Sequence, residues 1–214
     1  WTEITNGTPT TSNRIALAVS ADDPNYVYLF AGNGAGFVGL YRSTNSGTSF
    51  TLRSNTPNVC DWSIGGTGTG SQSWYDHVAI GDPTDGDHLY VGGINVWESV
   101  DGGLNWTIKT YWGGTSGSVQ GVHADHHAME YSLHTGDFFL GNDGGGFFST
   151  DGGTTWTDRS AGLGIAQVYK IGQSQKLKDL VINGYQDNGT AYYRRGSWIT
   201  EIGGDGMECI IDPN

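Results

Sequence analysis

Short runs of apolar residues, separated by segments rich in Gly, Asn, Asp and Ser, recur along the whole chain. Val, Ile, Tyr, Phe and Trp dominate these runs, and no helix-length window shows the 3.6-residue period of an amphipathic helix. The runs form groups of four, in residues 12–55, 75–112, 123–160 and 165–202. Four short antiparallel strands are the unit of a β-propeller. The pattern therefore predicts an all-β chain that contains about four such blades.

Both ends of the chain carry a further strand-like run. Residues 1–5 resemble the last strand of a preceding blade, and residues 205–214 resemble the first strand of a following one. The second comparison rests on Ile-Asp-Pro at 211–213, which echoes Gly-Asp-Pro at 81–83. We therefore expect a single partial propeller domain over residues 1–214. Because an incomplete ring leaves sheet edges uncovered, its expected partners are the remaining blades of a longer chain or another protein.

One octapeptide recurs in three of the four groups, each time between the third and fourth apolar runs. Its copies begin at Ser43, Ser99 and Ser149 and follow the pattern Ser-x-Asp-x-Gly-x-x-Trp, except that the first copy has Asn for Asp and Phe for Trp. The Asp side chain can accept turn N–H groups, the Gly allows positive φ, and the aromatic residue can pack back on the sheet. We therefore assign a structural role to Ser43, Asn45, Gly47, Phe50, Ser99, Asp101, Gly103, Trp106, Ser149, Asp151, Gly153 and Trp156.

The octapeptide is the Asp-box pattern, and the chain resembles the BNR-repeat propellers. Further motifs at 123–128, 141–145, 184–190 and 204–213 make it similar to large secreted BNR and sortilin-like propeller proteins of the type IX secretion kind. This resemblance covers essentially the whole chain. It implies a β-propeller that is secreted or held at the cell surface, and it carries no settled activity.

The charge of the chain narrows the choice of partners. There are 22 Asp and Glu residues against 10 Lys and Arg, which gives a formal net charge of −12. Such a surface repels nucleic acid and anionic membranes, and no apolar run is long enough to cross a bilayer. We expect neither nucleic-acid binding nor membrane insertion, whereas a polysaccharide remains a candidate partner. The acidity either keeps the protein soluble or, where carboxylates cluster, binds a cation such as Ca²⁺.

The octapeptides also indicate which face carries function. Connections between successive strands of a blade alternate between two faces, so the octapeptides mark one face. The loops between second and third strands, and those between blades, lie on the other, which we call the loop face. Sugars stack on aromatic rings and hydrogen-bond to amides and carboxylates. The ligand-binding candidates on this face are Trp62, Trp74, Tyr75, Asn142, Asp143, Gln186 and Asp187.

A catalytic and a metal-binding interpretation compete with plain binding. A glycoside hydrolase needs two carboxyl groups about 5–10 Å apart, and the sequence does not select a pair among Asp76, Asp125, Asp187, Asp205 and Glu208. His123, Asp125 and His127 would share one face of an extended strand, where neighbouring members could chelate Zn²⁺ together with ligands from another blade. In the alternative interpretation these polar groups cap loops and hydrogen-bond around the channel mouth. Apart from a Ca²⁺ or Zn²⁺ ion, no cofactor is assigned.

The sequence favours a non-catalytic extracellular module that binds glycans, mediates adhesion or contacts a protein partner. The alternative is a sialidase-like or xyloglucanase-like glycoside hydrolase that uses carboxylates on the loop face. The chain shows no cluster of three arginines of the kind that would clamp a sialic acid carboxylate.

Overall fold

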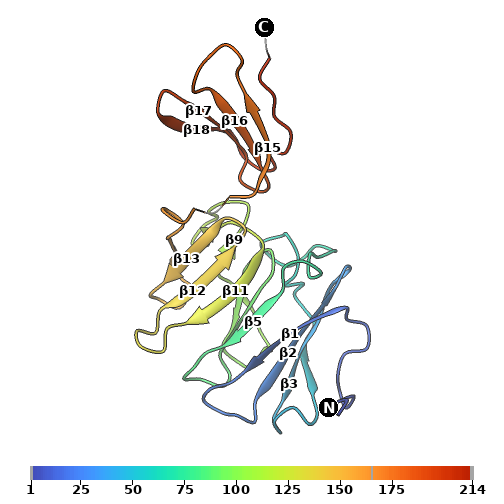
Figure 1. Ribbon diagram of the computed structural model, residues 1–214. Coiled ribbons are helices and arrows are strands. Elements are labelled where there is room, and N and C mark those ends of the chain that lie inside the picture. Colours follow the sequence, from blue (N-terminus) through green and yellow to red (C-terminus); the bar gives the residue numbers. More distant parts are fainter. Residues whose placement is uncertain (1, 165, 213–214) are drawn as a thin grey trace. The chain divides into compact units, whose positions relative to one another are not determined.

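The computed structural model describes residues 2–164 and 166–212, and all regular structure within them is β-strand (Figure 1). No helix among these residues could cross a membrane. The chain divides into two compact units, Trp1–Ser160 and Ala161–Asn214, where the sequence suggested a single domain.

Unit 1 contains three four-stranded antiparallel sheets, each with its strands in sequence order. The first sheet consists of β1 (Arg14–Val19), β2 (Val27–Asn33), β3 (Gly36–Ser43) and β4 (Thr51–Ser54). The second consists of β5 (Val78–Gly81), β6 (Leu89–Gly92), β7 (Val96–Ser99) and β8 (Thr107–Ile108). The third consists of β11 (His126–Tyr131), β12 (Phe138–Asn142), β13 (Gly145–Ser149) and β14 (Thr157–Asp158). A short parallel pair, β9 (Thr110–Tyr111) and β10 (Gln120–Gly121), lies between the second and third sheets in sequence.

Unit 2 contains one antiparallel sheet with strands in sequence order. It consists of β15 (Val168–Gln173), β16 (Val181–Tyr185), β17 (Thr190–Arg194) and β18 (Ser197–Ile202). All four sheets fall inside the ranges expected for blades, which confirms the all-β class. By contrast, residues 2–5 and 205–212 are not in strands, although Gly206 donates its backbone N–H to the Tyr185 carbonyl of β16 at 2.8 Å. Cys60 and Cys209 are free cysteines.

The core of unit 1 lies between neighbouring sheets, as the contacts on the two sides of β6 show. Successive residues of a strand point to opposite sides. On β6, Leu89 and Val91 pack with Phe30 and other residues of the first sheet, whereas Tyr90 packs with Phe138 of the third. All four β6 residues are buried, which is why this strand reads as a continuous apolar run. The second sheet is therefore covered on both faces.

The octapeptides build the connection between the third and fourth strand of each blade in unit 1. In the second copy, the Asp101 carboxylate accepts the N–H groups of Leu104 and Asn105 at 3.0 and 2.9 Å. The Ser99 hydroxyl accepts the Gly103 N–H at 2.9 Å, and Gly103 has φ of 85°. Burial acts to raise the pKa of Asp101, but hydrogen bonds from Asn105, Ser99 and Leu104 outweigh it and lower the pKa to about 2. The motif is thus an ionised, backbone-pinned turn.

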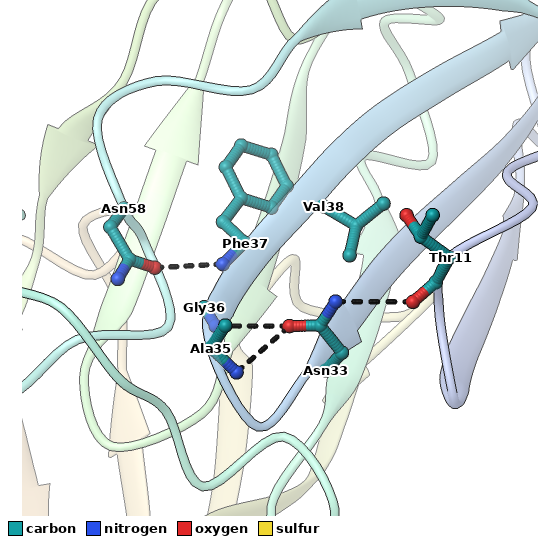
Figure 2. A pocket seen from close by; sticks show the side chains of 7 residues that line it. All are labelled: Thr11, Asn33, Ala35, Gly36, Phe37, Val38 and Asn58. Carbon is teal, nitrogen blue, oxygen red and sulfur yellow. Dashed lines mark hydrogen bonds between the residues drawn. The ribbon is translucent and has the colours of Figure 1, made fainter.

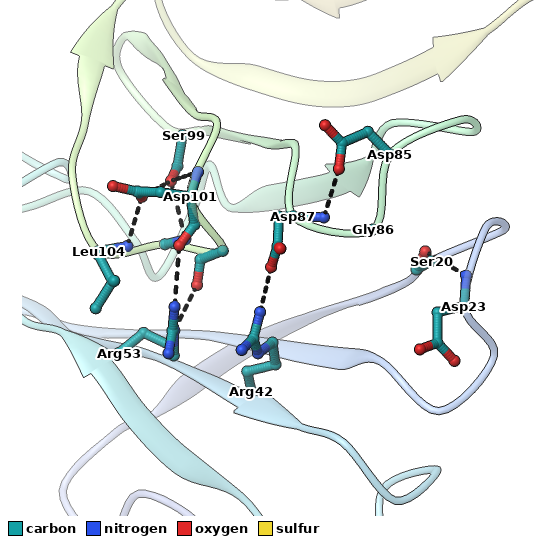
Figure 3. A network of polar contacts seen from close by, with 12 residues as sticks. Ser20, Asp23, Arg42, Arg53, Asp85, Gly86, Asp87, Ser99, Asp101 and Leu104 are labelled. Atoms are coloured by element: carbon teal, nitrogen blue, oxygen red, sulfur yellow. Dashed lines mark hydrogen bonds and ion pairs between the residues drawn. The ribbon is translucent and has the colours of Figure 1, made fainter.

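Residues at the octapeptide end also join one blade to the next (Figure 3). Arg53 donates its Nε to the Gly102 carbonyl at 2.8 Å and its Nη2 to the Asp101 carbonyl at 2.9 Å. Arg42 forms an ion pair with Asp87. Arg42 and Arg53 therefore hold the first and second sheets together at this end.

Candidate functional site

A pocket of about 390 Å³ lies beside the β2–β3 turn at the loop face (Figure 2). Its polar side chains are committed to the backbone. Asn33 accepts the N–H groups of Ala35 and Gly36 at 2.9 and 3.2 Å and donates to the Thr11 carbonyl at 3.1 Å. Asn58 accepts the Phe37 N–H at 2.9 Å and donates to two loop carbonyls. These amides shape the loops, so this pocket has few polar groups left to orient a ligand.

Elsewhere on the loop face of unit 1, Asp125 approaches Asp143 on one side and interacts with Asp76 on the other. Asp76 immediately precedes β5 together with His77, Asp125 immediately precedes β11, and Asp143 lies in the β12–β13 turn. β5 and β11 pack against each other, so the loops at their starts are brought together (Figure 1). Oxygens of Asp125 and Asp143 lie within 4.8 Å of each other. We call Asp76, Asp125 and Asp143 the carboxylate cluster.

Asp76 is the buried member of the carboxylate cluster. Asp76 is only 1% exposed, and no hydrogen bond of ordinary geometry reaches either of its carboxyl oxygens. Burial raises its pKa, and the neighbouring Asp125 carboxyl raises it further. Burial likewise raises the pKa of Asp125, to which the charge of Asp143 adds. Because two such groups resist ionising together, they favour sharing a proton or a cation.

Polar side chains hold the outer two members in place. Tyr75 donates its hydroxyl to Asp143 Oδ2 at 2.7 Å, and His127 Nε2 lies 2.8 Å from Asp143 Oδ1. The Tyr75 and His127 rings meet edge to face with centroids 4.8 Å apart. Gln72 donates its side-chain amide to Asp125 Oδ1 at 2.9 Å. Gln72 was not among the sequence candidates, because it lies in a Ser- and Gly-rich segment without periodicity.

The residues of the predicted chelating set, His123, Asp125 and His127, lie where the start of β11 is irregular. Asp125 has a left-handed backbone with φ of 63°, and the β11–β12 register shifts between His126 and Ala128. These irregularities take the three side chains off a common strand face. His127 turns to Asp143 instead, and Nδ1 of His123 lies 3.2 Å from the Ala124 carbonyl. The chelating set therefore stays a prediction, whereas Asp125 belongs to the carboxylate cluster.

A pair of tryptophans on the same face is fixed by hydrogen bonds. Trp112 donates its indole N–H to the Trp62 carbonyl at 2.8 Å and its backbone N–H to the Asn95 side chain at 2.9 Å. Asn95 is fully buried and donates in turn to the Asp61 carbonyl at 3.2 Å. Yet Trp112 is 47% exposed and Trp62 is 36% exposed. These two exposed residues are anchored by polar contacts.

Trp74 and Tyr75 form a second exposed aromatic pair. Trp74 is 63% exposed, its ring centroid lies 5.7 Å from that of Tyr75, and its carbonyl accepts a hydrogen bond from Arg14 at 2.9 Å. Tyr75 connects this pair to the carboxylate cluster through Asp143. The other candidate of unit 1, Asn142, donates to the His123 carbonyl at 2.9 Å and accepts the Gly144 N–H, so it serves the turn.

The remaining candidates lie in unit 2. Asp205 Oδ1 accepts hydrogen bonds from the Gln186 side chain at 3.1 Å and from the Asp187 N–H at 3.0 Å. Asp187 has φ of 59°, typical of a turn. Glu208 lies apart from these three in an exposed ion pair with Lys170 at 3.4 Å.

Several solved structures resemble this chain, whereas no family model and no curated protein matches it. An ancestral GH74 enzyme aligns with a TM-score of 0.50 and 17% identity over 98% of this chain and 29% of that chain. The GH74 xyloglucanase from Xanthomonas campestris aligns with a TM-score of 0.50 and 19% identity over 86% of this chain and 30% of that chain. YCF48 bound to D1 peptide gives a TM-score of 0.46 and 13% identity over 90% of this chain and 54% of that chain.

The two GH74 structures define the class of fold. Identities this low speak to fold alone, and they agree with the four-stranded sheets in supporting a β-propeller-like fold. The chain spans less than a third of the length of either GH74 chain. The two alignments therefore assign no activity to this protein.

Proposed function

We propose that unit 1 is a non-catalytic binding module of a secreted or cell-surface BNR-type propeller, and that its loop face binds a neutral polysaccharide. The observation that carries this proposal is the Trp62–Trp112 pair, whose exposed residues are tied to each other and to buried Asn95. Sugar rings stack on aromatic faces. The Trp112 ring is already held through its indole N–H, so it loses little conformational entropy on binding, which favours affinity.

The negative charge of the chain favours a neutral polysaccharide over an anionic one. The chain has a net charge of −12, and the carboxylate cluster lies on the same face as the tryptophans. A polyanionic ligand would meet repulsion from both. Neutral hydroxyl groups can instead hydrogen-bond to Tyr75, Gln72 and the outer carboxylates, as polar groups in sugar sites do. The octapeptides support the BNR assignment, and a polysaccharide ligand fits a location outside the cell.

Glycoside hydrolysis is the second candidate, favoured by the proximity of Asp125 and Asp143. Their oxygens approach within 4.8 Å, near the separation of about 5–5.5 Å found in retaining enzymes and well below the 6.5–9.5 Å of inverting ones. Both oxygens of Asp143 are engaged by Tyr75 and His127, and Asp76 is too buried to touch a substrate. We therefore rank binding above turnover.

The test is a calorimetric titration of the whole chain with xyloglucan, mixed-linkage β-glucan and polygalacturonate. We expect one of the two neutral polymers to bind and polygalacturonate not to bind. Because a central aromatic contact contributes about 2 kcal/mol or more, Trp112→Ala should weaken binding at least about 30-fold. The matched control is Trp198→Ala in β18, where the native residue is 52% exposed.

Two results would refute binding at this surface: no heat with either neutral polymer, or equal affinity of the wild type and Trp112→Ala. Release of reducing ends that is abolished by Asp143→Asn would favour the hydrolase instead.

A further inference from the structure

Asp125 and Asp143, the outer two members of the carboxylate cluster, have a spacing that suits a metal ion. Oxygens of Asp125 and Asp143 lie within 4.8 Å of each other. Ca²⁺ binds carboxylate oxygens at about 2.3–2.6 Å, so two ligands of one ion lie up to about 5 Å apart. The two loops that carry these residues are fixed by β11 and by the β12–β13 turn, and Gln72 and His127 orient the side chains. One ion can therefore contact both carboxylates with little rearrangement.

Asp76 supplies an independent reason to expect a cation. Its carboxyl is almost completely buried, receives no hydrogen bond of ordinary geometry, and interacts directly with the Asp125 carboxyl. A buried carboxylate without a donor or counter-ion is costly. Among the described residues, no Lys or Arg forms an ion pair with Asp76 or Asp125. A bound cation would offset the cost of placing these acidic groups together.

The donor atoms indicate which cation. Every carboxylate in the cluster offers hard oxygen ligands, which suit Ca²⁺ or Mg²⁺ better than Zn²⁺. The nearby imidazoles are engaged, since His127 Nε2 contacts Asp143 and His77 Nε2 contacts the Phe30 carbonyl. Two carboxylates on irregular loops do not supply six ligands in an octahedron, whereas Ca²⁺ accepts flexible geometry completed by water.

We propose that Asp125 and Asp143 of unit 1 ligate a Ca²⁺ ion that orders the loop face, and that buried Asp76 supports this site from behind Asp125. The proposal does not depend on polysaccharide binding, because it rests on the carboxylates and not on the tryptophans. Extracellular Ca²⁺ modules bind with dissociation constants of about 0.1–1 mM. This site should lie in that range, because water must complete its ligand set.

The test measures thermal unfolding of the whole chain after treatment with EDTA and dialysis, with and without 10 mM CaCl2. Wild type should gain about 3–6 °C with Ca²⁺ and less with MgCl2. Asp125→Asn should lose this gain, whereas Asp137→Asn in the β11–β12 turn should keep it. Without the ion, Asp125→Asn should melt no lower than wild type, because it relieves repulsion. Titration calorimetry with CaCl2 gives the stoichiometry, which should be one.

The proposal is overturned if CaCl2 leaves the wild-type melting temperature and the calorimetric baseline unchanged. It is equally overturned if Asp125→Asn and Asp143→Asn both bind Ca²⁺ as tightly as wild type. A variant that melts far below wild type without metal would indicate a structural role for that carboxylate in place of ion binding. In that case Asp143→Asn provides the second comparison, and retained Ca²⁺ affinity there refutes the site.

Discussion

Replacing Trp156 with Ala should lower the free energy of unfolding of unit 1 by about 3–5 kcal/mol. Trp156 ends the third octapeptide, is 5% exposed, and packs on Phe138 with ring centroids 5.4 Å apart. Its backbone is held by Gln120, which accepts the Trp156 N–H and donates to its carbonyl, both at 2.8 Å. Removing the ring leaves a cavity in the core between the second and third sheets. Urea unfolding followed by circular dichroism measures the loss.

Two further variants give this prediction its contrast. Trp156→Phe should cost much less than Trp156→Ala, because a ring remains and the buried indole N–H, which has no partner, is removed. Phe50→Ala, at the matching position of the first octapeptide, should also cost less, because Phe50 is only half-buried and outside the core clusters. Equal losses at residues 50 and 156 would mean that the octapeptide aromatic residue does not stabilise through burial.

Replacing Glu98 with Gln should lower the free energy of unfolding by about 2–4 kcal/mol, because it breaks a half-buried ion pair. Glu98 Oε2 lies 2.9 Å from Lys109 Nζ, and Oε1 lies 3.0 Å from His88 Nε2 and 2.9 Å from the Tyr90 hydroxyl. The Glu98 and Lys109 side chains are each 15% exposed. The control is Asp87→Asn, which removes the ion pair with Arg42. Asp87 is half exposed, so this loss should be about 0–1 kcal/mol.

The contacts of Glu98 with His88, Lys109 and Tyr90 predict how the stability of the fold changes with pH. Burial acts to raise the pKa of Glu98, but hydrogen bonds from His88, Lys109 and Tyr90 outweigh it and lower the pKa from 4.5 to about 2. Its contribution is therefore present above pH 4.5 and lost as the pH falls toward 2. The hydrogen bond to Glu98 raises the pKa of His88 above 6.5, so that contribution is present below pH 6.5 and lost above it.

The stability difference between wild type and Glu98→Gln should accordingly be largest between about pH 4.5 and 6.5. Chemical unfolding of both proteins from pH 3 to pH 8 measures this difference. A difference that stays constant over the whole range would show that Glu98 stabilises the fold through packing instead of charge.

The blades could be predicted from the sequence because strand composition and turn motifs are local features. Leu89, Tyr90 and Val91 read as a strand by composition, and the Asp-Gly-Gly of the octapeptide specifies its own turn. The division into two compact units could not be predicted in this way. The fourth blade carries the same local strand pattern as the other three, so the pattern holds no sign of the division.

The site depends on contacts that no local pattern encodes. Asp76, Asp125 and Asp143 were each singled out, yet only the packing of β5 against β11 brings them together. A register shift and one left-handed residue make the start of β11 irregular around His123, Asp125 and His127, and neither feature has a signature in His-Ala-Asp-His-His. The anchoring of Trp112 by buried Asn95 likewise joins two loops that are separate in sequence.

The central claim is that the loop face of unit 1, and not the octapeptide end, is the binding face. Hydroxyl-radical footprinting of the whole chain with saturating xyloglucan, or mixed-linkage β-glucan if titration selects that polymer, tests it directly. We predict protection of Trp62, Trp74 and Trp112, with unchanged oxidation of exposed Leu104 in the second octapeptide. Protection of Leu104 with the three tryptophans still fully oxidised would contradict the account.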